Sequence, residues 1–312
     1  GITIGESSTE YAASAYILSL SALGIEEFNE AIKYGDIVLS YYRDNSLNDS
    51  INISQIEYIV GKSHFALGNN NKAYEYLMNA QNHFPTNLQS INIVYSNILN
   101  DLGLVHRELK DYLKALELVE KSISLKEKII GGNHLDYAIG LHNMALCLYD
   151  NNKKNEAIEY GEKARDILVK YKNNPNLIKC LTNLSSSYLG TNQYTLAINR
   201  GEEARTLMIN KSDINSNEYA SCLSILAYSY FAKEEIDKAI KYQEEALHIS
   251  RNNKNRENII ESLFNLGRYY YDLNQYDNAI TYYEEAFNLC ENINEIEDSN
   301  YYYALLYLSR SY

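Results

Sequence analysis

Apolar residues recur along this chain at intervals of three and four, in segments separated by short polar stretches. The stretch LFNLGRYYYDLNQYDNAITYYEEAFNL at 263–289 contains two such segments, which flank the polar turn DLNQYD. Apolar residues with this period form the buried face of an α-helix. The pattern therefore predicts a hairpin of two helices, helix A followed by helix B.

The hairpin recurs along the chain, as one alanine of helix B shows most clearly. Successive copies of this anchor alanine are separated by 42, 42, 42, 40, 42 and 40 residues. The anchors are Ala31, Ala73, Ala115, Ala157, Ala197, Ala239 and Ala279. Seven residues after each anchor, and twelve before it, stands another small residue, such as Ala80 and Gly61 around Ala73. Because small residues let helix axes approach closely, these positions predict where the helices pack.

The order of these residues resembles the tetratricopeptide repeat. That pattern has a large apolar residue followed by Gly or Ala in helix A, an aromatic residue near the turn, and alanines in helix B; here 263–289 shows all of them. The common unit has about 34 residues, and the longer period here is similar to that of kinesin light chains, as is a loop ending in acidic residue–Tyr–Ala at 136–138. The resemblance implies an all-α, right-handed solenoid of helical hairpins.

The period predicts seven repeats, at 12–53, 54–95, 96–137, 138–177, 178–219, 220–259 and 260–301. Residues 1–11 resemble an inter-repeat loop, and 302–312 resemble helix A of an eighth, truncated repeat. Terminal repeats usually carry a polar cap, which 302–312 lacks. We therefore expect the chain to be part of a longer protein; the alternative is that 302–312 is a natural end cap.

Composition narrows the class of function. The net charge is −13, which disfavours direct binding to nucleic-acid phosphates or to anionic membranes. No apolar run is long enough to span a bilayer, and the four cysteines form no Cys-x-x-Cys pair. These features are typical of a cytoplasmic protein without a structural metal. The 31 tyrosines against 6 phenylalanines indicate that tyrosine is the main aromatic packing residue.

The titratable residues form no pattern expected of a catalytic centre. The six histidines lack the spacing of metal ligands, and His64 and His106 stand where other repeats have tyrosine, which predicts packing. The Glu-Glu pairs at 202–203, 244–245 and 284–285 recur just before a core alanine, which predicts a solvated helix face. We expect no enzyme activity, no catalytic residue, no cofactor and no bound metal.

Helix A offers the candidate binding surface, because solenoids of this kind bind through the concave face that helix A lines. The same position of helix A is asparagine in three repeats, at Asn143, Asn183 and Asn265, and Asp101 in a fourth. The resemblance implies that this position hydrogen-bonds a peptide backbone, and an amide both donates and accepts. Further candidates on this face are Asn97, Lys62, Lys179, Tyr228, Arg268 and His142. The alternative is that these are ordinary solvated positions.

The sequence therefore predicts a non-catalytic scaffold that holds a protein or peptide in its concave groove, and leaves the oligomeric state open. One alternative is a sensory array that controls an effector domain outside this chain, such as a caspase-like protease or a nucleotide-binding domain. Another is a peptide-pheromone receptor. An enzyme within the array is the least favoured hypothesis, because no catalytic constellation is present.

Overall fold

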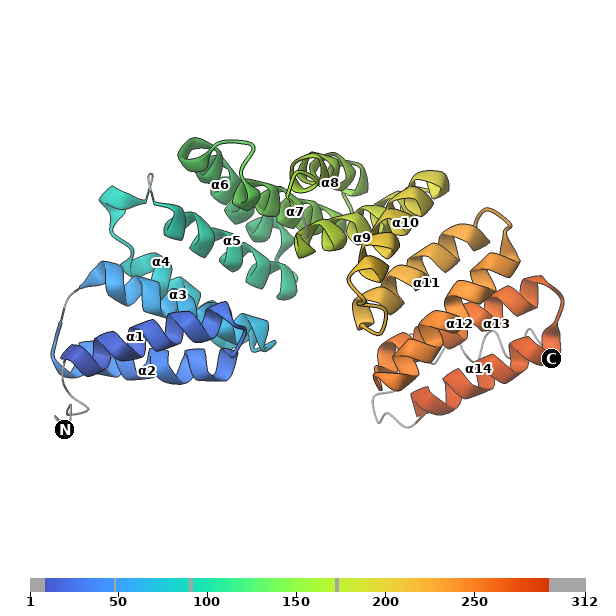
Figure 1. The fold of residues 1–312 in the computed structure, drawn as a ribbon, viewed down its shortest axis with the longest axis horizontal. Coiled ribbons are helices and arrows are strands. Elements are labelled where there is room, and N and C mark those ends of the chain that lie inside the picture. The colour runs from blue at the N-terminus through green and yellow to red at the C-terminus, as the bar shows by residue number, and fades with distance from the viewer. Residues whose placement is uncertain (1–8, 48, 90–91, 172–173, 292–312) are drawn as a thin grey trace. The chain divides into compact units, whose positions relative to one another are not determined.

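The computed structural model describes residues 9–47, 49–89, 92–171 and 174–291. Their fourteen α-helices follow one another as hairpins (Figure 1). The pairs are α1 (Thr9–Gly24) and α2 (Phe28–Asp44), α3 (Ser50–Ala66) and α4 (Asn70–His83), α5 (Ile93–Glu108) and α6 (Tyr112–Ile130), α7 (Leu135–Asp150) and α8 (Lys154–Leu168), α9 (Pro175–Leu189) and α10 (Tyr194–Asn210), α11 (Asn217–Phe231) and α12 (Ile236–Asn252), and α13 (Arg256–Asp272) and α14 (Tyr276–Glu291). A 3₁₀ helix, η1 (Thr86–Leu88), follows α4. The predicted helix at 302–312 and most of the predicted loop at 1–11 lie outside the described residues.

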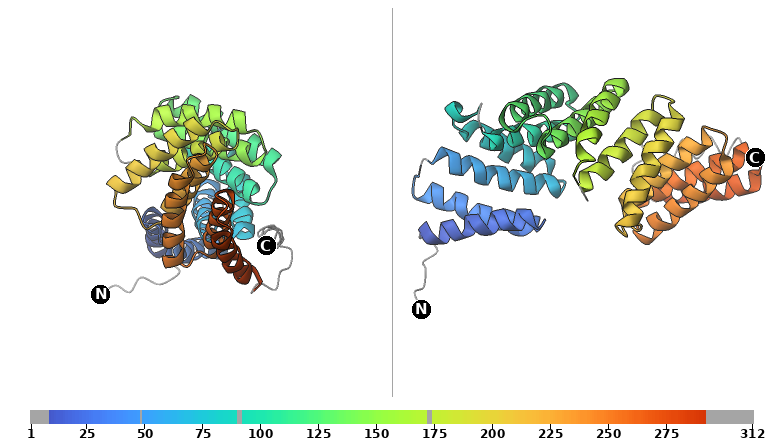
Figure 2. Two further views of the ribbon diagram at one scale, coloured as in Figure 1. Left: turned by 90° about the vertical axis from the view of Figure 1, so that its right-hand side faces the viewer. Right: turned by 45° about the horizontal axis from the view of Figure 1, so that its top comes forward.

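The chain divides into two compact units, Gly1–Ile167 and Leu168–Tyr312, which we call unit 1 and unit 2. The same packing rule holds inside each unit (Figure 2). In unit 1 each helix from α1 to α7 packs on the next one, and in unit 2 the same is true from α9 to α14. Successive A helices also contact each other, as in α1–α3, α3–α5 and α5–α7, and in α9–α11 and α11–α13. The fold is thus the TPR-like helical solenoid that the sequence predicted.

The anchor alanines form the centre of each hairpin. All seven are 0 or 1% exposed. Beside the anchor alanines, a glycine on one helix lies opposite a larger side chain of a neighbouring helix. A Cβ atom added to Gly267 of α13 would lie 2.6 Å from Cε1 of Tyr283, whereas one added to Gly201 of α10 would lie 3.0 Å from Oγ of Ser185. A glycine on one helix thus faces a larger residue on the other, which keeps the helices close without a void.

The turn between helix A and helix B has one backbone geometry in every hairpin. The residue five before the anchor has a positive φ of 58–75°. These residues are Glu26, Gly68, Lys110, Asn152, Asn192, Glu234 and Asn274. The next backbone N–H closes the end of helix A, as where Asp111 donates to the carbonyl of His106 at 2.9 Å. A left-handed residue at this place is the usual way to end a helix.

Rings from helix A and helix B stack in three hairpins. His64 stacks on Tyr76, Tyr230 on Tyr242 and Tyr270 on Tyr282, with centroids 5.5–5.6 Å apart. The predicted packing role of His64 is therefore confirmed.

A carboxylate of the preceding hairpin binds each stacked pair. In unit 2, Glu202 accepts hydrogen bonds from the hydroxyls of Tyr230 at 3.2 Å and Tyr242 at 2.7 Å. Burial and this carboxylate together raise the pKa of Tyr230 to about 12. Glu244 accepts in the same way from Tyr270. The Glu-Glu pairs that the sequence assigned to a solvated face thus also connect neighbouring hairpins.

Candidate functional site

In unit 1, polar side chains from three consecutive A helices meet around Asp101 of α5, which is 8% exposed. One carboxylate oxygen accepts from the Tyr58 hydroxyl of α3 at 3.0 Å, and the other from the Asn100 amide at 2.8 Å. The Lys62 ammonium of α3 lies 3.7 Å from the same carboxylate. A buried carboxylate is costly unless it is paired in this way.

The cluster continues to α7 through a pair of amides. Asn143 donates to the side-chain oxygen of Asn100 at 3.0 Å, and both residues are buried. The adjacent His142 is also buried, at 5% exposure. The chain of hydrogen bonds Tyr58–Asp101–Asn100–Asn143, which we call the polar ladder, therefore connects α3, α5 and α7.

Lys126 of α6 lies next to the polar ladder, and the sequence interpretation missed it. The residue is 3% exposed, and its side chain lies against Gly140 of α7. Burial lowers the pKa of its ammonium, while the negative charges of Asp101 and Asp136 act in the opposite direction. Its position, eleven residues after the anchor, could have revealed it, because the other repeats carry no charge there.

In unit 2, Tyr228 of α11 and Arg268 of α13 come together as part of an aromatic group. Arg268 donates to the Tyr228 hydroxyl at 3.2 Å, and its guanidinium lies 5.0 Å from the ring centre of Phe231. The Tyr269 ring stacks on the Phe231 ring, with the two ring centroids 4.6 Å apart. Tyr228 and Arg268 are half-buried, so this group joins a cation to a partly exposed aromatic surface.

Asn265 belongs to a different network of unit 2, centred on Gln243 of α12. Gln243 is 0% exposed, and its amide nitrogen donates to the hydroxyls of Ser224 and Ser262, both at 3.0 Å. Its oxygen accepts from Asn265 at 3.4 Å. Donors and acceptor of Gln243 are thus all used, across α11, α12 and α13.

Three further predicted residues lie on α5 and α9. In unit 1, Asn97 of α5 is half-buried, and its side chain makes no hydrogen bond with any described residue. In unit 2, Lys179 of α9 is exposed and Asn183 is half-buried.

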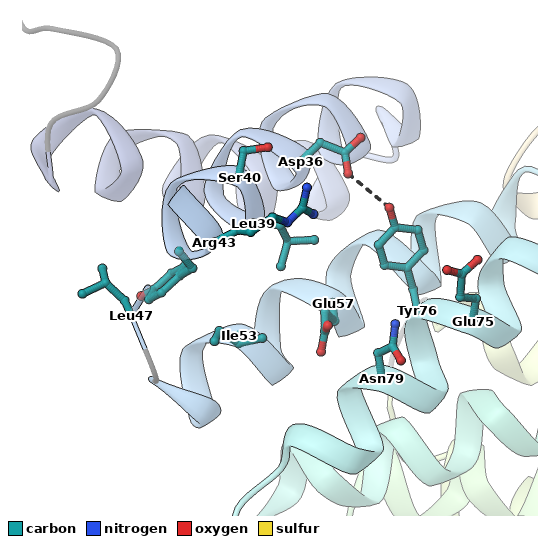
Figure 3. Close-up of a pocket in the computed structure, with 11 residues that line it drawn as sticks. Asp36, Leu39, Ser40, Arg43, Leu47, Ile53, Glu57, Glu75, Tyr76 and Asn79 are labelled. Carbon is teal, nitrogen blue, oxygen red and sulfur yellow. Dashed lines mark hydrogen bonds between the residues drawn. The ribbon is translucent and has the colours of Figure 1, made fainter. Parts of the chain in front are cut away.

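Unit 1 also has a polar cavity of about 510 Å³ between α2 and α4, with α3 as its floor (Figure 3). The Tyr76 hydroxyl points across it toward Asp36, at 3.4 Å. Glu57 lines the floor, is 6% exposed and is bonded to His83 at 2.7 Å. Burial raises the pKa of Glu57, and His83 opposes that rise. The buried carboxylate of this cavity therefore already has a partner within the protein.

Three further features concern metal binding, the thiols and membrane insertion. In the described residues, no three His, Cys, Asp or Glu side chains are grouped so that they could hold a metal ion. The four cysteines are buried thiols, and burial raises the pKa of Cys147 and of Cys222 to about 12. Within the same residues, no helix has the length and apolar character needed to cross a membrane.

Comparison with known proteins identifies the family. A model described as tetratricopeptide repeat matches residues 94–170 and 218–292. The chain is a tetratricopeptide repeat (TPR) protein. The polar ladder and the Arg268 group are therefore features of helix A in a TPR array.

Three solved structures illustrate the likeness of fold. The TPR-like repeats of a Podosopora anserina protein assigned as a kinesin light chain are 17% identical, with a TM-score of 0.55 over 65% of this chain and 97% of that one. The STAND protein PH0952 of Pyrococcus horikoshii, which has a TPR sensor, is 17% identical, with a TM-score of 0.73 over 97% of this chain and 44% of that one. A Rap protein complexed with competence and sporulation factor is 13% identical, with a TM-score of 0.68 over 97% and 80% of the two chains.

Curated relatives match over short segments. The secreted RxLR effector protein RXLR-C07 of Plasmopara halstedii is 32% identical over 75 residues, which is 24% of this chain. This match spans 23% of that relative's length, and the match to the RxLR effector protein SFI4 of Phytophthora infestans spans 18% of its length.

Proposed function

We propose that this TPR array binds a protein or peptide along the helix A face of its units, with no catalytic centre of its own. The observation that supports this most is the polar ladder of unit 1. The position held by Asp101 and Asn143 is occupied by Ile59 in the preceding hairpin, where it is 3% exposed. Hairpins can therefore stack with an apolar residue there, and polar groups at this place favour a binding role.

The ligand proposed for this face is an extended segment with exposed backbone amides and polar side chains. Lys62, at the exposed edge of the polar ladder, and Arg268 with Tyr228 in unit 2 would make direct contacts. Asn97, Asn183 and Lys179 are half-buried or exposed and would add hydrogen bonds. Asn143 and His142 are buried and Asn265 is hydrogen-bonded to Gln243, so these three would hold the directly contacting residues in place.

A second candidate is that the array senses a ligand for a larger protein. The comparison with PH0952 favours it, since that protein carries a TPR sensor and this chain matches 44% of its length. The Rap complex with a peptide factor favours a related version, in which a small peptide is the signal. Both versions use the same helix A face and differ from a scaffold only in what binding controls.

The proposal is tested by selecting peptides from a displayed random library on the purified chain, then measuring affinities for variants. Lys62→Ala should lower roughly tenfold the affinity of selected peptides that contact Lys62, and Arg268→Ala should do the same for peptides that contact Arg268. The matched control is Lys241→Ala, an exposed lysine of α12 on helix B. Peptides that bind every variant equally, or a library that yields no specific peptide, would overturn the proposal.

A further inference from the structure

We propose that the cavity between α2 and α4 of unit 1 binds a free amino acid with an apolar side chain, whose carboxylate pairs with Arg43 and whose ammonium pairs with Asp36. The cavity lies between two B helices, with α3 as its floor (Figure 3). Its lining includes none of the residues assigned to the peptide-binding face. The inference therefore goes beyond the proposed function and does not depend on it.

The equivalent junction between the last two hairpins of unit 2 is closed by an ion pair. The Arg251 guanidinium donates to both oxygens of the Glu285 carboxylate, at 2.5 and 2.7 Å. Arg251 stands twelve residues after its anchor alanine, and Glu285 stands six residues after the next anchor. The same two positions between α2 and α4 are Arg43 and Asn79, and both residues line the cavity. Unit 1 thus keeps the cation of this junction and replaces its carboxylate with a neutral amide.

The Arg43 guanidinium is left without an internal partner. It makes no hydrogen bond, and no ion pair within 4.0 Å, with any described residue. The residue is exposed, and Figure 3 shows its guanidinium reaching from α2 into the cavity, toward the side where Tyr76 lies. A guanidinium is a planar fork that binds a carboxylate through two parallel hydrogen bonds, as Arg251 does. The group that Arg43 lacks is therefore a carboxylate.

The Asp36 carboxylate also lacks donors that its counterpart in unit 2 has. Glu202, at the equivalent position, accepts hydrogen bonds from two tyrosines, at 3.2 and 2.7 Å. Asp36 is one methylene shorter, and among the described residues it accepts from Tyr76 alone, at 3.4 Å. The second tyrosine is replaced by His64, whose Nδ1 atom is buried without a partner in the same part of the chain. Asp36 therefore keeps an oxygen for a donor from outside.

The cavity has a polar end and an apolar end (Figure 3). Asp36 and Tyr76 lie at the polar end, Leu47 and Ile53 lie at the apolar end, and Arg43 lies between the two ends. The volume of about 510 Å³ is in the range of small-molecule sites. A ligand that fits this order has a cationic group at one end, a carboxylate next to it and an apolar group beyond the carboxylate.

The charges of the lining select a zwitterion over an anion or a simple amine. Glu75 adds a negative charge at the polar end, and Glu57 on the floor is bonded to His83. A phosphate with about two negative charges would be repelled by these carboxylates. An amine without a carboxylate would be attracted to them, but it would leave Arg43 unpaired beside a second cation. An α-amino acid supplies one charge of each sign, and its side chain can reach the apolar end.

The first experiment measures the binding of leucine and phenylalanine to the purified chain by isothermal titration calorimetry. Isopentylamine and phenethylamine are the analogues without a carboxylate, and isocaproate and hydrocinnamate are those without an ammonium. We expect each analogue to bind roughly tenfold more weakly than its amino acid, or weaker still. An amine or an acid that binds as tightly as its amino acid would overturn the proposal, and so would a chain that binds neither amino acid.

The second experiment compares Arg43→Gln with a matched control, Arg251→Gln, which changes the arginine at the equivalent position of unit 2. Arg43→Gln should lower the affinity for leucine and phenylalanine roughly tenfold, because the ligand carboxylate loses two charge-assisted hydrogen bonds. Arg251→Gln should bind them as the wild type does, because Arg251 is already paired with Glu285. Unchanged affinity in Arg43→Gln, or an equal loss in both variants, would contradict the assignment of the site.

A third variant, Asn79→Glu, supplies the internal carboxylate that unit 2 has at this position. We expect the new carboxylate to pair with Arg43, which should raise the urea midpoint of unfolding and lower the affinity for both amino acids roughly tenfold. Because stability and binding change in opposite directions, damage to the fold would not account for the lost affinity. Wild-type affinity in Asn79→Glu would overturn the role of Arg43 as the carboxylate partner.

Discussion

Each unit buries a long polar side chain at a core position of helix B, Lys126 in unit 1 and Gln243 in unit 2, and the two differ in what surrounds them. In unit 2, Gln243 uses both donors and its acceptor on Ser224, Ser262 and Asn265. In unit 1, Lys126 has no hydrogen-bonding partner among the described residues. A saturated polar group fixes the packing of its own helices, whereas an enclosed charge without a hydrogen-bonding partner lowers stability. The number of internal partners should therefore decide how each side chain affects the stability of its unit.

The largest effect is expected when the same substitution is made at both positions. Gln243→Met should destabilise unit 2 by about 2–4 kcal/mol, because the hydroxyls of Ser224 and the buried Ser262 both lose the hydrogen bond from Gln243. Lys126→Met should leave unit 1 as stable or stabilise it by on the order of 1 kcal/mol, because a buried charge is removed. Urea denaturation followed by circular dichroism measures the free energy of unfolding of both variants. A larger loss for Lys126→Met than for Gln243→Met would contradict this expectation.

The dependence on pH sharpens the same comparison. The folded pKa of Lys126 is lowered from its ordinary value of 10.5, so the unfolded chain binds more protons in the window just below 10.5. Stability therefore rises with pH through that window as the buried amine loses its proton. We expect the advantage of Lys126→Met over the wild type to shrink as the pH is raised toward 10.5, since tyrosine titration is common to both proteins.

Gln243 supplies the control for this pH experiment because its side chain does not titrate. The difference between the wild type and Gln243→Met should stay constant over the same pH range. A difference that falls equally for both variants would show that the pH effect does not come from Lys126.

The fold was predictable because stacking imposes a period on the sequence. Small residues where helices cross, and a large residue opposite each glycine, recur at fixed distances from the anchor, so counting residues locates them. The same counting reveals Lys126 when the repeats are compared one by one, and hides it when they are averaged into a common pattern.

The site was less predictable, because its contacts depend on which residue the preceding repeat supplies. Asn143 carries the amide expected on the helix A face, but that amide donates to Asn100, 43 residues earlier. The partner of Glu202 is likewise a pair of tyrosines from the following hairpin. The first pairing does not follow from the repeat pattern, since the residues equivalent to Asn100 differ among the hairpins, whereas the second recurs one hairpin later as Glu244 with Tyr270.

Two equivalent hydrogen bonds between neighbouring hairpins, one in each unit, differ in length. The Tyr242 hydroxyl donates to Glu202 at 2.7 Å in unit 2, whereas that of Tyr76 donates to Asp36 at 3.4 Å in unit 1. Because a hydrogen bond to a carboxylate contributes about 1.5–3 kcal/mol when it is short and partly buried, Tyr242→Phe should destabilise by about 1–2 kcal/mol and Tyr76→Phe by less. Urea denaturation of both variants checks the order, and equal losses would contradict it.

The smallest effect concerns the turns, which share one geometry in both units. Lys110 in unit 1 and Glu234 in unit 2 have φ values of 63° and 64°, where Gly68 fills the same position of another hairpin. A side chain in this left-handed region costs roughly 1 kcal/mol that glycine avoids, although glycine gains more freedom in the unfolded chain. Lys110→Gly and Glu234→Gly should therefore each stabilise by about 0.5 kcal/mol, measured as a higher urea midpoint with an unchanged slope. A lower midpoint for Lys110→Gly alone would mean that the lysine side chain, and not only the backbone, stabilises the turn in unit 1.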